Sequence, residues 1–401
     1  VGKTVISAHL ARVIGYPVAV VCPKIVIPHW ERELAEVGIS PVFVLNHEKI
    51  KRGSTEFLRK VGKKLFRWSL PENTLLIWDE VHKCKAPYSQ NSQMLIAAKQ
   101  AGHYNLMLSA TACQDPTETR SIGYALNLHS LNKSENGLMS WNKWMESYGC
   151  RMDQWRNWVA GPLRELERLN GNMYGIVATK LTPKDLPSAF AENHIITEPL
   201  AFASLSKIKK YYEENGITPE IVDMFLEGGA ASPHIMVQIL RARQLAEIAK
   251  VPDIIDMVWD ARSEGSSVAI FVNFSDTLEA IRAAFPTGCS FIAGGQSATV
   301  REENIQAFQS NRNLVIVSNI AAGGLGVSLH DETGDRPRVS LISPTFNVKE
   351  YIQTLGRIHR AGAKSPALQR VLVASGSIEE RVMATMEKKR IALETLHAQQ
   401  V

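Results

Sequence analysis

Short, uninterrupted apolar runs alternate with longer stretches of helical pattern, and these runs fall into two separate groups. Runs of this kind predict strands that are buried on both faces, as in parallel sheets covered by helices. The first group comprises residues 18–22, 75–78 and 105–108, and the second comprises residues 268–272, 314–317, 339–342 and 371–374. We therefore expect an α/β fold with two lobes, each built on its own parallel sheet.

The stretch between the two groups, residues 130–260, shows few strand signals and predicts a helical connector segment. We place the N-terminal lobe at residues 1–195, with a helical insertion at about 130–195, and the C-terminal lobe at residues 196–401. The insertion contains four tryptophans, which are Trp141, Trp144, Trp155 and Trp158. They could stack on nucleic-acid bases, but their helical spacing is more typical of a small hydrophobic core.

The composition excludes a disordered or fibrous chain, because 45% of the 401 residues are hydrophobic and 21% are charged. No apolar run is long enough to span a membrane, and the first residues carry no signal-peptide pattern, so we expect a protein that is not secreted. The five cysteines stand singly and indicate neither a zinc site nor disulfides. The net charge of +5 permits a nucleic-acid partner without requiring one.

The chain opens on Val1-Gly2-Lys3-Thr4, followed by a helical run. This matches the second half of the phosphate-binding loop GxxxxGK[ST], in which backbone N–H groups at a helix N-terminus bind phosphate. Gly2 would contribute its N–H, Lys3 would reach the β- and γ-phosphates of ATP, and Thr4 would ligate Mg²⁺. The leading glycine of such a loop would precede Val1, so we expect a fragment of a longer protein.

Asp79 and Glu80 follow directly after the predicted strand 75–78. Parallel sheets bind ligands at the carboxyl ends of their strands, so we expect Asp79 to hold Mg²⁺ and Glu80 to orient the attacking water. A solvated acidic pair is the alternative, and the phosphate loop upstream favours the ATPase interpretation. Ser109 and Thr111 follow the next predicted strand, where their hydroxyls could bond a neighbouring carboxylate and sense the γ-phosphate.

The second group of strands carries two further motifs. Gly324 and Gly326 lie in a glycine-rich segment after the strand 314–317, where the backbone could approach a phosphate; a flexible loop is the alternative. Arg357 and Arg360 are one helical turn apart and share a face. Two guanidiniums on one face suit a triphosphate as arginine fingers, whereas an isolated pair would suggest a solvated basic face.

Taken together and in this order, the segments GKT, DEVH, SAT, AAGGLGV and QTLGRIHRAG resemble the motifs of superfamily 2 helicases, with a DEAH-like box at residues 79–82. Residues 22–24 with 29–33, residues 291–297 and residues 378–382 are similar to segments of Swi/Snf-like translocases. The resemblance covers nearly the whole chain. It implies two RecA-like lobes, with ATP and Mg²⁺ bound in the cleft between them.

The resemblance also implies roles for single residues. Gln353 would lie near the nucleotide, and His82, Ser109 and Thr111 would couple the nucleotide site to movement. Contacts to nucleic acid are implied for Lys24, Trp30, Asn273, Ser318 and Asn319.

The function that the resemblance implies is that of an ATP-dependent helicase or translocase that moves along DNA, with double-stranded DNA favoured over single-stranded DNA or RNA. An RNA-directed ATPase on the same fold is an alternative. A non-catalytic scaffold is a third, but the lysine, both carboxylates and both arginines of an ATPase are present. The compact lobes suit a protein of the bacterial cytoplasm or nucleoid, or of a virus-infected cell.

Overall fold

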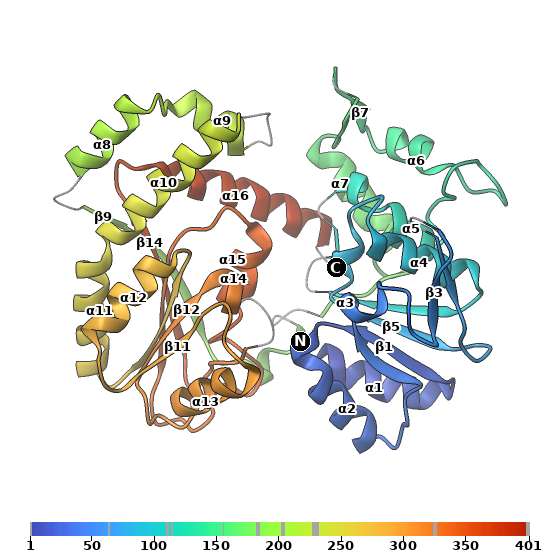
Figure 1. The fold of residues 1–401 in the computed structure, drawn as a ribbon, viewed down its shortest axis with the longest axis horizontal. Coiled ribbons are helices and arrows are strands. Elements are labelled where there is room, and N and C mark those ends of the chain that lie inside the picture. Colours follow the sequence, from blue (N-terminus) through green and yellow to red (C-terminus); the bar gives the residue numbers. More distant parts are fainter. Residues whose placement is uncertain are drawn as a thin grey trace. The chain divides into compact units, whose positions relative to one another are not determined.

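The computed structural model describes residues 2–62, 65–109, 112–113, 115–154, 156–181, 185–201, 205–226, 232–323 and 327–397. The chain forms two compact units, which we call the first lobe (Gly2–Lys180 with Ile391–Val401) and the second lobe (Leu181–Arg390). Figure 1 shows the ribbon of each. The boundary expected near residue 195 falls inside a strand of the second lobe, so the division in the structure comes earlier.

The first lobe is built on a four-stranded parallel sheet in the order β2-β1-β5-β6. The strands of the lobe are β1 (Val18–Cys22), β2 (Phe43–Asn46), β5 (Leu75–Asp79) and β6 (Tyr104–Leu108), with two short antiparallel pairs, β3 (Leu58–Lys60) with β4 (Phe66–Trp68) and β7 (Arg151–Met152) with β8 (Trp158–Val159). Its helices are α1 (Lys3–Ile14), α2 (Ile27–Glu36), α3 (His47–Ile50), α4 (Gln90–Gln100), α5 (Arg120–Ala125), α6 (Trp141–Ser147) and α7 (Leu163–Met173), with 3-10 turns η1 (Lys24–Val26), η2 (Val81–Cys84) and η3 (Pro116–Glu118). All three strands expected in this half are confirmed.

Successive side chains of these strands point to opposite faces of the first sheet, so each face has its own hydrophobic core. Val20 and Ile77 pack with α1 and α2 on one face, whereas Val21 and Trp78 pack with α4 and the β3–β4 pair on the other. Every residue of β1 and β5 is buried, including Asp79 at the end of β5. Burial on both faces is why these strands appear in the sequence as uninterrupted apolar runs.

The tryptophans of the insertion form the small hydrophobic core that their spacing predicts. Trp141 and Trp144 are buried together with Met173 of α7, and Trp158 packs against this cluster. The fourth, Trp155, lies outside the described residues. The rings of Trp141 and Trp144 are therefore not open to nucleic-acid bases.

The second lobe is built on a six-stranded parallel sheet in the order β11-β12-β10-β13-β14-β9. Its strands are β9 (Asn193–Leu200), β10 (Ser267–Val272), β11 (Cys289–Ile292), β12 (Val315–Asn319), β13 (Arg338–Ile342) and β14 (Ala367–Ala374). Its helices are α8 (Leu205–Glu214), α9 (Pro219–Leu226), α10 (Pro233–Ala249), α11 (Val251–Ser263), α12 (Ser275–Ala284), α13 (Ala298–Gln309), α14 (Ile320–Gly323), α15 (Val348–Leu355) and α16 (Ile378–His397), with the 3-10 turn η5 (Pro187–Ala189). The four strands expected in this half are confirmed, and together the two lobes form the predicted α/β fold with parallel sheets.

Helices cover both faces of the second sheet. Ile270 packs with α11 and α12, whereas its neighbour Phe271 packs with α13 and α15. Strand β9 interrupts the connector that was expected to be helical, and it had no apolar run because only Leu200 of its eight residues is buried. It is an edge strand, which also explains why it tolerates Pro199. No described helix is both long and apolar enough to cross a bilayer.

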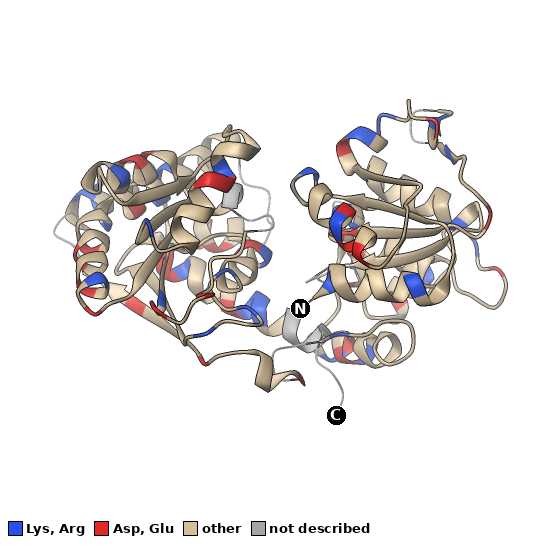
Figure 2. Cartoon of the chain, turned by 90° about the horizontal axis from the view of Figure 1, so that it is seen from below, with Lys and Arg blue, Asp and Glu red and all other residues tan. Residues whose placement is uncertain are grey.

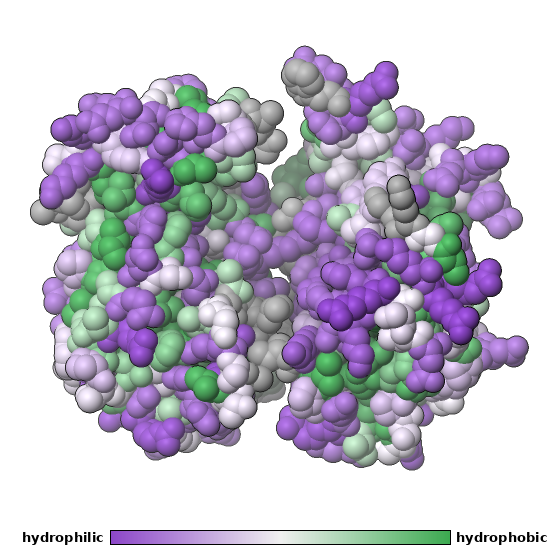
Figure 3. Space-filling model, viewed as in Figure 1, coloured by the Kyte–Doolittle hydropathy of each residue, from purple (hydrophilic) through white to green (hydrophobic). Residues whose placement is uncertain are grey.

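Basic and acidic residues are interspersed along the ribbon of each lobe (Figure 2). Apolar side chains reach the surface over α10 to α12 of the second lobe (Figure 3), where Met236, Val237, Leu240 and Trp259 are exposed. Charge alone therefore does not mark a binding face, and the functional site has to be found from its individual residues.

Candidate functional site

Gly2, Lys3 and Thr4 form the start of α1, as the motif predicts. Gly2 is the N-cap and has φ = +56°, a left-handed conformation that glycine adopts without strain. Lys3 and Thr4 occupy the first turn and are half-buried. That turn carries no acidic side chain, so its free N–H groups and the positive end of the helix dipole can bind an anion such as a phosphate.

Glu80 lies beside Lys3, because the Lys3 Nζ donates a hydrogen bond to Glu80 Oε1 at 3.3 Å. Glu80 follows β5 directly and has φ = +56° and ψ = +50°, a strained conformation for a residue with a side chain. Burial alone would raise the pKa of Glu80, but the hydrogen bond from His82 and the charge of Lys3 outweigh burial and lower it to about 2. Glu80 is therefore an ionised carboxylate at neutral pH.

His82 joins the ends of β5 and β6. Its Nδ1 lies 3.0 Å from Glu80 Oε2 and 3.1 Å from the Oγ of Ser109, the residue that follows β6. The structure thus brings Ser109 to the imidazole, which in turn contacts the carboxylate. Thr111, the other hydroxyl expected at this strand end, lies outside the described residues.

Asp79 is held at three points. Its Oδ2 accepts a hydrogen bond from the indole Nε1 of Trp30 at 3.0 Å, and its Oδ1 accepts one from the backbone N–H of Glu80 at 3.0 Å. Its backbone carbonyl lies 3.0 Å from Nε2 of the buried His47. Burial raises the pKa of Asp79, and the hydrogen bond from Trp30 and the charge of Lys3 oppose that effect.

The oxygen atoms of Thr4 and Asp79 are of the type that binds magnesium. Mg²⁺ prefers hard oxygen ligands and commonly takes one or two carboxylates together with phosphate oxygens. Each carboxylate oxygen of Asp79 accepts one hydrogen bond and keeps a further lone pair. A hydroxyl and a carboxylate of this kind suit an ion that arrives with a nucleotide.

The two residues of the first lobe that were expected to contact nucleic acid, Lys24 and Trp30, differ in their exposure to solvent. Lys24, in η1 just after β1, is exposed. Trp30 is fully buried, and its indole contacts Asp79 in place of the expected nucleic acid. The amphipathic pattern of α2 explains the difference, because Trp30 and Leu34 face the sheet on the buried side of the helix.

In the second lobe, the residues expected to contact nucleic acid are Asn273, Ser318 and Asn319. Their side chains bond to neighbouring strand ends within the lobe. The amide nitrogen of Asn273 donates to Glu247 Oε2 and to the carbonyl of Pro344, and that of Asn319 donates to the carbonyl of Asn273. Ser318 is buried, and its hydroxyl donates to the carbonyl of Asn319. The side-chain amide nitrogens of both asparagines thus donate within the lobe, and Ser318 is almost completely buried.

Two charged or polar residues that shape these strand ends belong to no motif. The buried carboxylate of Glu247 accepts hydrogen bonds from the backbone N–H groups of Asn273 and Phe274. His47 holds the carbonyl of Asp79. The position of Glu247 on the buried side of α10 is a signal that its carboxylate has a partner inside the protein. The sequence does not show which residues these partners are, because they lie more than 20 positions away.

Arg357 and Arg360 come together, but not on one face of a helix as expected, because α15 ends at Leu355 and both arginines follow it. Both side chains bond to one carbonyl. Nitrogens of the two guanidiniums donate to the carbonyl of Val327 at 2.9 and 3.2 Å. Arg357 is only 4% exposed, and burial lowers the pKa of Arg360. Gln353 is half-buried on α15, one turn before Arg357. Gly324 and Gly326, which precede Val327, lie outside the described residues.

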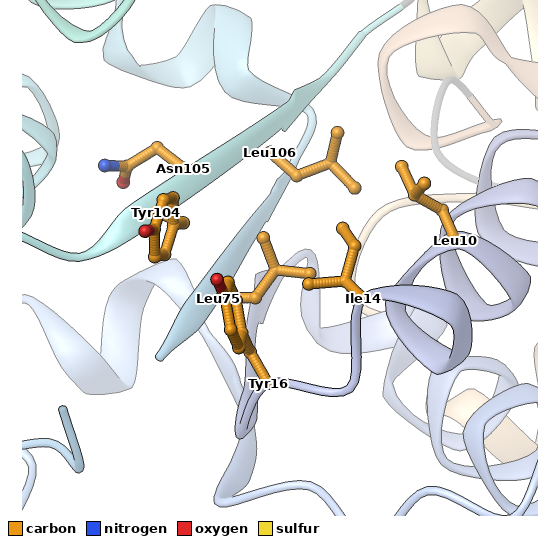
Figure 4. A pocket seen from close by; sticks show the side chains of 7 residues that line it. All are labelled: Leu10, Ile14, Tyr16, Leu75, Tyr104, Asn105 and Leu106. Carbon is orange, nitrogen blue, oxygen red and sulfur yellow. The ribbon is translucent and has the colours of Figure 1, made fainter. Parts of the chain in front are cut away.

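An apolar cavity of about 210 Å³ in the first lobe is separate from this site. Its lining residues are Leu10, Ile14, Tyr16, Leu75, Tyr104, Asn105 and Leu106 (Figure 4). Leu75 and Tyr104 begin β5 and β6, whereas Asp79 and Ser109 lie at the opposite ends of these strands. The cavity therefore lies at the amino ends of β5 and β6, whereas Glu80 and its partner Lys3 lie at the carboxyl end of β5.

Comparison with known proteins gives the family. The model of the helicase conserved C-terminal domain matches residues 248–362. A putative ATP-dependent RNA helicase of Acanthamoeba polyphaga mimivirus is 30% identical over 416 residues, which cover 97% of this chain and 76% of that protein. The protein CHROMATIN REMODELING 24 of Arabidopsis thaliana is 23% identical over 90% of this chain and 40% of its own length. The DNA repair protein rad8 of Schizosaccharomyces pombe is 25% identical over 33% of this chain and 12% of its own length.

The chain thus spans about three quarters of the viral relative and less than half of the other two. The match to the viral protein extends over nearly the whole chain, across both lobes. The chain belongs to the Swi/Snf-like helicases of superfamily 2, a family of ATP-dependent enzymes built on RecA-like lobes.

Proposed function

We propose that this protein hydrolyses ATP at the site formed around Lys3, Asp79 and Glu80, and that hydrolysis drives its movement along double-stranded DNA. The observation that carries the proposal is the contact between Lys3 and Glu80 at the carboxyl end of β5. A phosphate at the first turn of α1 would meet the Lys3 ammonium, and a water attacking that phosphate would meet the Glu80 carboxylate.

Each residue has a distinct task in this proposal. Lys3 balances the charge of the β- and γ-phosphates, and in doing so its ammonium exchanges the carboxylate of Glu80 for phosphate oxygens. Glu80, freed from Lys3 but still held by His82, accepts a hydrogen bond from the attacking water and orients it. Thr4 and Asp79 hold Mg²⁺, which when bound neutralises phosphate charge.

The arginines of the second lobe are proposed to act on the same phosphate. Arg357 and Arg360 would leave the carbonyl of Val327 and stabilise the charge that develops on the transferred group. A guanidinium stays charged even when it is buried, so both residues can keep this role despite their low exposure.

Double-stranded DNA is the proposed track. Two relatives that match this chain carry names that refer to chromatin remodelling and to DNA repair, which favours DNA. The viral relative is named an RNA helicase, so RNA is the second candidate. Lys24 is exposed at the end of β1 and can contact a backbone phosphate, the part of a nucleic acid that carries no sequence information.

A triplex-displacement experiment tests the movement. The protein should release a labelled third strand from a DNA triplex when ATP is present and should not release it with ATP replaced by ADP. Unwinding of an RNA duplex without any displacement on DNA would favour the second candidate. A control protein with Lys3→Ala should release neither strand.

A further inference from the structure

We propose that Trp30 is a positioning residue that fixes the carboxylate of Asp79 for the Mg²⁺ that accompanies ATP; this rests on the ATPase function proposed above. No motif rule assigns such a role to this tryptophan. The resemblance pointed instead to a contact with nucleic acid, which its complete burial does not allow.

The hydrogen bond between the two side chains is buried. The indole Nε1 of Trp30 lies 3.0 Å from Asp79 Oδ2, and both groups are buried. An indole N–H can only donate, so the oxygen that faces it has to be an acceptor. The contact therefore uses one lone pair of Oδ2 and leaves another that a cation can bind.

The same contact fixes the orientation of the carboxylate. Oδ1 of Asp79 accepts the N–H of Glu80, and Oδ2 accepts the indole of Trp30, so the plane of the group is set from two sides. The Asp79 carbonyl is held by His47. Of these three contacts, only that of Trp30 is made by a side chain to the carboxylate itself, so it is the one that a substitution can remove cleanly.

Packing around Trp30 fixes the position of its indole ring. It lies on α2, which follows η1 without a break, and it packs with Leu34, Val20 and Ile77 between the helix and the sheet. A ring fixed by packing holds its N–H in one place. Groups that orient a metal ligand in this way typically change metal affinity 10- to 100-fold when they are removed.

Trp30→Phe is the variant that tests the proposal, because it keeps an aromatic ring in the cavity and removes only the donor. Trp68→Phe is the matched control. Trp68 is also buried and donates its Nε1 to the carbonyl of Met94 at 3.0 Å, but it packs on the other face of the sheet. Thermal unfolding of both variants reports any general loss of stability.

The first measurement is the affinity for a fluorescent, non-hydrolysable ATP analogue with Mg²⁺ and with EDTA. We expect Mg²⁺ to strengthen binding to the wild type and to Trp68→Phe equally, and the strengthening to fall about tenfold or more in Trp30→Phe. Binding in EDTA should be the same in all three proteins, because Lys3 and the first turn of α1 are unchanged.

The second measurement is the Mg²⁺ concentration that gives half-maximal ATPase activity, which should rise about tenfold in Trp30→Phe, with the rate at saturating Mg²⁺ closer to that of the wild type. Equal Mg²⁺ dependence in Trp30→Phe and Trp68→Phe would overturn the proposal. A wild-type protein that binds no nucleotide in either condition would contradict the ATPase function itself, and with it the role given to Trp30.

Discussion

The Nζ of Lys3 donates a hydrogen bond to Oε1 of Glu80 at 3.3 Å, although 77 positions separate the two residues in the chain. The contact joins the first turn of a helix to the end of a strand. It leaves the lysine with a carboxylate as its partner, in the place where the proposed function puts a phosphate. The first prediction below follows from this exchange of partners.

Replacement of Glu80 with glutamine should abolish turnover and preserve ATP binding. The amide keeps the shape of the side chain but cannot accept a proton from water, and loss of such a group typically costs 10²- to 10⁴-fold in rate. Steady-state hydrolysis and nucleotide affinity are the measurements. Glu118→Gln is a suitable control, since Glu118 also pairs with a lysine of the first lobe, Lys85. Near wild-type hydrolysis by Glu80→Gln would mean that another group orients the water.

Stability should fall with acidity through the titration of His47. Burial lowers the pKa of His47 from 6.5 to about 4, so the folded protein keeps it neutral while the unfolded chain becomes protonated below pH 6.5. The unfolded state then binds more protons, and the stability due to neutral His47 is complete above pH 6.5 and is lost as the pH falls from 6.5 towards 4. The full effect is at most about 3 kcal/mol.

Denaturant unfolding between pH 7.5 and pH 5 tests this. Tryptophan fluorescence reports mainly on the first lobe, which contains seven of the eight tryptophans. In His47→Gln, which retains an N–H donor but does not titrate, the free energy of unfolding should depend less on pH than in the wild type. The same slope in both proteins would show that His47 does not contribute.

The two arginines should differ in their effect on stability but not in their effect on rate. Arg357→Ala and Arg360→Ala should each lower turnover about 10³-fold or more, with a smaller change in ATP affinity. Only Arg357 is nearly inaccessible, so Arg357→Ala should also lower the melting temperature of the protein. Because both residues serve one transition state, the double variant should be far from additive. Weaker ATP binding at an unchanged rate would make them ground-state contacts.

Binding to nucleic acid should weaken steeply with salt and depend little on sequence, because phosphate contacts dominate. Lys24→Ala should reduce the magnitude of the slope of log affinity against log salt concentration by about 1, the value expected for the loss of one phosphate contact. Lys60→Ala, which removes an exposed lysine from β3 of the same lobe, is the control. An identical slope for Lys24→Ala and the wild type would exclude Lys24 from the phosphate contacts.

The sequence predicted the strands that are almost wholly buried, and it recognised only some of the strands that lie at the edge of a sheet. Strands β10 and β12 are almost wholly buried and appear as apolar runs. Strand β9 lies at the edge of its sheet and has no such run. Strand β2 was missed although residues 42–45 are all apolar, whereas the partly exposed edge strand β6 was predicted. An edge strand can be polar and exposed along most of its length, as β9 is, and such a strand has no apolar pattern to recognise.

The residues of the site were predictable as far as their chemistry follows from local position. Lys3 at a helix start and Glu80 after a strand are indicated by motifs, and the structure brings them together. The partners of Trp30 and Glu247 are not local. Their buried hydrogen bonds to Asp79 and to the backbone of Asn273 depend on how helices pack against the sheets, which no spacing in the sequence records.

The most direct test of the proposed function is the ATPase rate measured with double-stranded DNA, single-stranded DNA, RNA and no nucleic acid, for the wild type and for Glu80→Gln. The proposal predicts that double-stranded DNA stimulates the wild type most strongly and that Glu80→Gln stays inactive with every nucleic acid. Stimulation by RNA alone, or a rate that no nucleic acid changes, would contradict it.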